Sequence, residues 1–164
     1  MSERTYATWV DPVASALADD RRELLEFATS ASAAFWDQPS SVDAWTNRDI
    51  LAHLAGGNDL LVQTLLGSLT AGETLDPKSL APDTDAENAR RVAERRVWPL
   101  PRLIAELERD HDEVLGWLSQ LDEHDRDLRP EGLGMTVGEF FRIVQDEHHD
   151  LVHLHQLRPE RQDK

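Results

Sequence analysis

The sequence contains no cysteine among its 164 residues. Disulfide bridges, metal sites built from thiolates and a cysteine nucleophile are therefore excluded together. Any thiol chemistry carried out by this protein would need a thiol supplied from outside the chain.

Long apolar runs are missing as well. A membrane-spanning helix needs roughly 18 or more consecutive apolar residues, and no such run occurs. The segment from Met1 to Val10 does not resemble a signal peptide. We therefore expect a cytoplasmic protein with no membrane partner, and the length favours a single domain over residues 1–164.

Positive charge is scarce. The sequence has 17 basic and 32 acidic residues, which gives a formal net charge of −15. Such a surface repels phosphate backbones and anionic lipids, so we expect no nucleic-acid partner. One basic cluster is interleaved with glutamates and is interpreted as a solvated helix face: Arg90, Arg91, Arg95 and Arg96.

Helical patterns cover most of the chain, and no segment has a convincing strand pattern. Apolar periodicity predicts four long amphipathic helices, at about residues 12–36, 46–69, 99–121 and 136–157. A shorter polar helix is expected at 83–97, between the second and third long helices. The expected fold class is all-α, a four-helix bundle with one short extra helix.

Two of the predicted helices begin with the same start signal. Thr46 and Asp49 form a capping box, and Thr136 and Glu139 repeat it. In such a box each side chain binds the backbone N–H of the other residue, so the signal marks the first residue of a helix.

Three of the seven histidines can be assigned to one site. His149 and His153 are four residues apart, so on a helix their rings lie side by side, about 6 Å apart at the backbone. His148 and His155 are about two turns apart and cannot share an ion without a third element. Imidazole pairs suit zinc, nickel, copper or iron rather than calcium.

The third candidate ligand is His53, which lies about 10 Å into the second predicted helix. The midpoint of His149 and His153 lies about 9 Å from the far end of the fourth. If these two helices are antiparallel, the three rings come to the same height. A site with three histidines leaves a coordination position open, as catalytic metal sites do.

An alternative interpretation of the pair is a solvated polar face. The apolar stripe of the fourth predicted helix, through Phe140, Val144 and Leu151, lies nearly opposite His149 and His153. If the pair binds a metal, this polar face must line a cavity or an interface.

Two segments resemble a known family. The stretch Trp45-Thr-Asn-Arg-Asp-Ile-Leu-Ala-His53-Leu-Ala-Gly-Gly-Asn58 resembles the second-helix signature of the DinB/YfiT-like proteins. The stretch His149-Asp-Leu-Val-His153-Leu-His-Gln156-Leu157 resembles their fourth-helix signature. The two motifs occur in the family's order, and the resemblance spans nearly the whole chain.

This resemblance implies a four-helix bundle of up-down-down-up order, often dimeric, in which three histidines bind a divalent metal. Carried over to this chain, the ligands are His53, His149 and His153, and the ion is zinc, nickel, iron or manganese. Members include thiol transferases that use low-molecular-weight thiols and a mycothiol-dependent maleylpyruvate isomerase. The isomerase branch has Glu-x3-His where this chain has His149-x3-His153, which favours the DinB/YfiT side.

Four further residues are candidates for the surroundings of the metal. Gly57 lies one turn beyond His53 and provides either close helix packing or room for a substrate. His111 falls in the apolar stripe of the third helix, where a core histidine bonded to a carbonyl is favoured over a contact with substrate or ligands. Asp146 or Asp150 would orient a ligand imidazole.

These residues predict metal-assisted activation of a small nucleophile. The resemblance implies that the nucleophile is a small thiol, such as mycothiol or bacillithiol, which is transferred to an electrophilic small molecule, as in detoxification. The resemblance also implies a homodimer. Two alternatives stay open. One is a metal-dependent hydrolase that uses metal-bound water, and the other is a non-catalytic metal-binding or sensor module.

Overall fold

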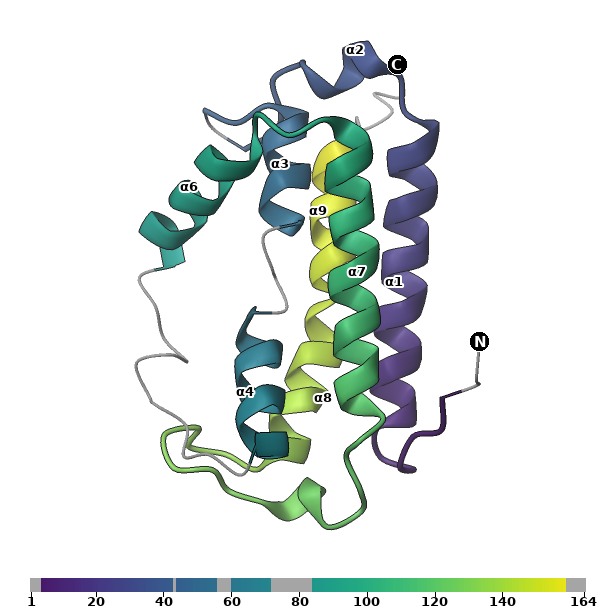
Figure 1. Cartoon of the computed structure of the whole chain (residues 1–164), viewed down its shortest axis with the longest axis vertical. Helices are drawn as coiled ribbons and strands as arrows, with labels where there is room; N and C mark the ends of the chain where they lie inside the picture. Colours follow the sequence, from purple (N-terminus) through teal and green to yellow (C-terminus); the bar gives the residue numbers. More distant parts are fainter. Residues whose placement is uncertain (1–3, 43, 56–59, 72–83, 159–164) are drawn as a thin grey trace, which may run out of the picture.

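The computed structural model describes residues 4–42, 44–55, 60–71 and 84–158. Over these residues the fold is all-helical and has no named strand, as the sequence predicts (Figure 1). No helix in these ranges is both long enough and apolar enough to cross a membrane.

The first predicted helix is divided into two. Helix α1 spans Asp11–Ser30, and the short helix α2 spans Ala33–Trp36. Between them Ser32 is extended, and its side chain accepts a hydrogen bond from the Phe35 N–H. The single helix expected over 12–36 is therefore wrong, because this serine caps a new helix instead of continuing the old one.

The second predicted helix corresponds to α3, Asn47–Leu54, and α4, Leu60–Ala71. Its capping box is confirmed: the Thr46 side chain accepts from the Asp49 N–H, and the Asp49 carboxylate accepts from the Thr46 N–H at 3.0 Å. The continuity predicted between α3 and α4 falls on residues 56–59, outside the described part of the chain.

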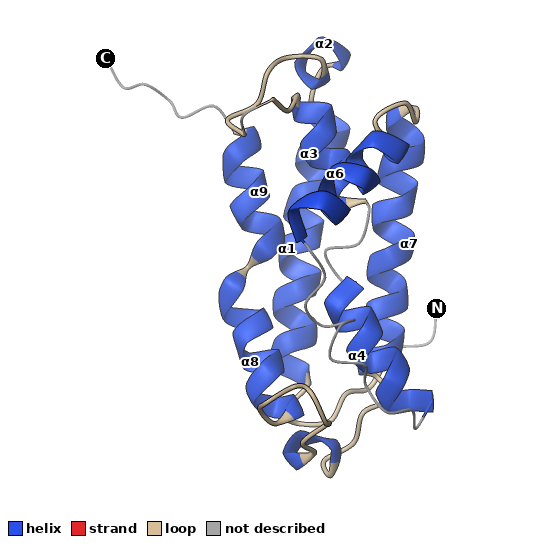
Figure 2. Cartoon of the chain, turned by 90° about the vertical axis from the view of Figure 1, so that its left-hand side faces the viewer, coloured by secondary structure: helices blue, strands red, loops and turns tan. Residues whose placement is uncertain are grey.

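The next two predicted helices are close to their expected positions. Helix α6 spans Thr84–Arg95 and packs against α3, as Figure 2 shows. Helix α7 spans Leu100–Leu118 and lies between α1 and α4 in contact with both. A short 3-10 helix, Asp125–Asp127, follows it.

The fourth predicted helix is also divided. Helix α8 spans Val137–Glu147 and begins at the predicted capping box of Thr136 and Glu139, while α9 spans His149–Leu157. Between them His148 takes the left-handed conformation, with φ 45° and ψ 50°. The continuous helix expected over 136–157 is therefore wrong at one residue, next to the proposed ligand pair.

Two groups of buried apolar residues form the core. The α8 core lies between α1, α4, α7 and α8 and includes Val13, Leu66, Leu118 and Phe141. The α9 core lies between α1, α2, α3, α7 and α9 and includes Leu24, Trp36, Ile50, Leu107 and Leu154. The residues proposed to bind metal belong to the helices around the α9 core.

Candidate metal centre

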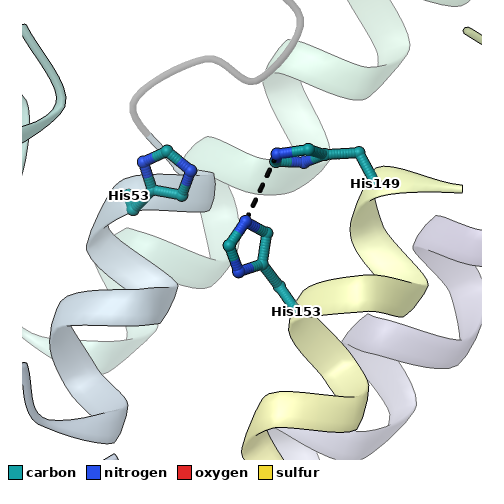
Figure 3. A group of neighbouring side chains, drawn as sticks. All are labelled: His53, His149 and His153. Atoms are coloured by element: carbon teal, nitrogen blue, oxygen red, sulfur yellow. Dashed lines mark hydrogen bonds between the residues drawn. The ribbon is translucent and has the colours of Figure 1, made fainter. Parts of the chain in front are cut away.

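Three histidines from two helices converge in the structure (Figure 3). His53 lies in the last turn of α3, His149 is the first residue of α9, and His153 follows one turn later. Each ring offers a nitrogen within 4.8 Å of a nitrogen of the other two. The structure therefore brings together the three residues that the sequence selects as ligands.

The spacing of these nitrogens suits one small cation. The Nε2 atoms of His149 and His153 are 3.3 Å apart. Two imidazole nitrogens bound to one tetrahedral zinc ion at about 2.0–2.1 Å are about 3.3–3.4 Å apart. The ring of His53 is somewhat farther away: its centroid lies 4.9 Å from that of His153 and 5.8 Å from that of His149, whereas the centroids of His149 and His153 are 4.5 Å apart.

His53 is the most deeply buried of the three, with 9% of its surface exposed. Its Nδ1 atom is buried and has no hydrogen-bond partner within the described chain. The indole of Trp45 covers one side of the ring at a centroid distance of 5.5 Å. Burial of an imidazole nitrogen without a partner is costly, and such a group is typical of a site built for a ligand rather than for stability.

The electrostatics of the site keep the rings neutral. Burial, with the neighbouring histidines and Arg91 adding to it, lowers the pKa of His53 from 6.5 to about 3. Loss of hydration beside the neighbouring side chains, together with His153, lowers the pKa of His149 to about 4, although part of this residue is still exposed to solvent, and burial lowers the pKa of His153 too. At neutral pH each ring therefore carries a lone pair, which is the form that binds a metal ion.

Gln156 orients one of the rings. Its Oε1 lies 2.7 Å from Nδ1 of His153, and an amide oxygen can only accept, so Nδ1 donates. The lone pair of His153 is then on Nε2, which faces His149. Sequence reasoning did not assign this role to Gln156, although its position three residues after His153 on a helix would have indicated the contact.

The other predicted site residues have different surroundings. Asp150 is buried, and its carboxylate accepts hydrogen bonds from Arg21 of α1. Asp146 is exposed on α8, before the break at His148. His111 lines an open groove with residues of α1, and burial lowers its pKa to about 4. Gly57 lies outside the described residues.

Comparison of the sequence with known protein families identifies the family of this chain. The sequence model of the family described as the mycothiol maleylpyruvate isomerase N-terminal domain matches residues 17–158. The chain belongs to this family. The family is part of the DinB/YfiT-like superfamily, as the resemblance predicted. No curated protein and no solved structure matches the sequence.

The match falls on the isomerase branch, whereas the motif at His149 favoured the other side of the superfamily. His149 stands at the position where the resemblance implies a glutamate for that branch.

Proposed function

We propose that this protein is a metal-dependent enzyme that activates a small thiol for transfer to an electrophilic small molecule. The observation that carries the proposal is the convergence of three neutral imidazoles, from His53, His149 and His153, in a chain that has no thiol of its own. The family name supports mycothiol as the first thiol to test.

When bound, a divalent ion such as zinc, nickel, iron or manganese would lower the pKa of a thiol, so that thiolate is available at neutral pH. The residues of the chain have separate tasks. The three imidazoles hold the ion, and Gln156 keeps the lone pair of His153 directed at it.

Access to the site supports a small-molecule substrate. His53 is buried under Trp45, whereas His149 is exposed at the start of α9. A substrate would approach from the side of His149, while the apolar environment of His53 strengthens electrostatic interactions at the ion.

We also propose that α3 and α4 together form one member of a four-helix bundle of up-down-down-up order. In Figure 1, α1 and α9 run toward the end of the molecule where α2 lies, while α3 and α7 begin at that end. We propose in addition that the chain is a single domain over 1–164 that works in the cytoplasm as a homodimer.

Metal content is the first test. Protein purified without a histidine tag is expected to contain about one divalent ion per chain. His149→Ala and His153→Ala are expected to lose it. The matched control is His155→Ala, which removes an exposed imidazole from the same helix and should leave the metal content unchanged. A natural chain that takes up no metal on reconstitution would contradict the proposal.

Activity of the metal-loaded protein separates the alternatives. Conjugation of a model electrophile with added mycothiol or bacillithiol supports the transferase. Turnover that needs no added thiol would point instead to a hydrolase. A bound metal that does not exchange, together with no turnover of either kind, would leave a structural or sensor module.

A further inference from the structure

The break at His148 has a cause in the packing of α8 and α9. The buried residues of the two helices, placed on one imagined continuous helix, lie on faces roughly a third of a turn apart. Those in α8 are Val137, Phe140 and Phe141, and those in α9 are Asp150, Leu154 and Leu157. Both helices pack against α1, so a straight helix would turn one of the two sets away from it.

The left-handed residue His148 ends α8, and α9 then begins with its faces rotated relative to those of α8. The buried residues of both helices can therefore face α1. Among the described residues, only His148 and Ala44 have positive φ without being glycine. A residue with a Cβ is strained in this conformation. His148 also directly precedes a proposed metal ligand, so its conformation sets the direction in which His149 leaves the backbone.

Two consecutive residues of α1 bind the neighbours of His149 on both sides. The Nδ1 of His148 donates to the Asp20 carboxylate at 2.8 Å. Arg21 donates through Nε and Nη2 to Asp150, and its Nη1 donates to the Leu107 carbonyl of α7 at 2.6 Å. His149 lies between the two bound residues, and its ring faces the other way, toward His53 and His153 (Figure 3).

The three charged residues are buried, whereas the His148 side chain is 47% exposed. Asp20 is 7% exposed, Arg21 2% and Asp150 8%. Charged groups are rarely buried unless they are paired, and a buried pair of this kind is weak evidence for stability alone. Its geometry does fix the rotation of α9 about its own axis.

We propose that Asp20 and Arg21 are positioning residues of the metal centre. By binding His148 and Asp150 they hold the left-handed turn and the first turn of α9, and so direct His149 toward the other two imidazoles. This inference rests on the proposed function, because Asp20 and Arg21 position His149 for binding a metal ion.

The first experiment measures zinc affinity by competition with a chromophoric chelator. Asp20→Ala is expected to weaken binding about tenfold to a hundredfold, the range found when a residue that orients a metal ligand is removed. The matched control is Asp19→Ala, which removes the neighbouring exposed carboxylate, paired with Arg22, and should bind as the natural chain does. Asp20→Asn keeps an accepting oxygen and should also retain affinity. Equal affinity of Asp20→Ala and the natural chain would overturn the inference.

The second experiment repeats Asp20→Ala in a His148→Gly background. Glycine adopts positive φ without strain, so the turn no longer needs the Asp20 carboxylate. His148→Gly is expected to bind zinc nearly as tightly as the natural chain, and adding Asp20→Ala should cost nothing further. An equal loss of affinity in both backgrounds would show that the carboxylate does not act through His148, and that result would contradict the positioning role.

The third readout needs no metal. The Val152 N–H donates to the His148 carbonyl at 3.0 Å, so its hydrogen exchange reports the first turn of α9. In metal-free protein this exchange should be faster in Asp20→Ala, but not in Asp19→Ala or Asp20→Asn. If the natural chain binds no zinc while this pattern holds, the proposed function fails and the positioning stands. Unchanged exchange in Asp20→Ala overturns the positioning whatever the metal content.

Discussion

The two cores of this molecule bury different kinds of residue. The α8 core is made of apolar side chains and includes Phe141, which is fully buried between Trp9 and Phe140. Among the described residues, seven polar or charged side chains are buried. Asn47, Asp49, His53 and Asp150 lie on α3 and α9, which border only the α9 core, whereas Asp20, Arg21 and Asp110 lie on α1 and α7, which border both cores. None lies on α8, so apolar packing alone holds that end of the bundle, and buried polar groups occur toward the end that carries the three proposed ligands.

The largest expected effect breaks the α8 core. Phe141→Ala should lower the free energy of unfolding by about 3–5 kcal/mol, because it removes a buried aromatic ring and leaves a cavity. Urea denaturation measures this loss, and Ile143→Ala, at a position 42% exposed on the same helix, is the control with little effect. The zinc affinity of the folded fraction should stay unchanged. A parallel loss of affinity would show that the two cores are not separate in function.

A change at His53 should have the opposite result, a loss of metal binding without a loss of stability. His53→Leu should abolish metal binding, because it removes one of the three proposed ligands. It should also raise the unfolding free energy of the metal-free protein by about 1 kcal/mol, since a buried nitrogen without a partner is replaced by an apolar group. Metal analysis and urea denaturation of the same samples test both statements. A metal-free variant less stable than the natural chain would contradict the view that this residue costs stability.

Acid should act on the end of the bundle that carries the histidines. The pKa of His53 is lowered to about 3 and that of His149 to about 4, against 6.5 as the ordinary value. Between these values the unfolded chain binds more protons than the folded one, so stability falls as pH drops. Metal-free protein should therefore lose thermal stability from about pH 6.5 downward, and His53→Leu should flatten the profile. An identical slope in that variant would show that the titrating groups are elsewhere.

The smallest expected effect concerns Gln156. Gln156→Leu removes the acceptor that holds the His153 ring and should weaken zinc binding about tenfold. The unfolding free energy should hardly change, because the residue is only partly buried. Chelator competition gives the affinity, with His155→Ala as the control on the same helix. An undiminished affinity would mean that packing alone orients His153.

Sequence reasoning succeeded where the interaction is local. The capping boxes at Thr46 and Thr136 predicted two helix starts because each box joins residues three apart. The heights of His53 and of the pair on α9 followed from helix rise alone, and the structure brings their rings together.

Contacts between distant residues could not be predicted in this way. Asp150 was expected to orient a ligand imidazole, and nothing in the sequence indicated that Arg21, 129 residues away in the chain, donates to its carboxylate. The break at His148 depends on the same face of α1, and no residue in its own segment forces it.

The ring of Trp45 lies 5.5 Å from that of His53, and this contact gives the molecule its own optical reporter. Indole emission responds to the charge of a group close to it. If His53 binds a cation, the emission of Trp45, one of the five tryptophans, is expected to change, so that occupancy can be followed in solution without an added label.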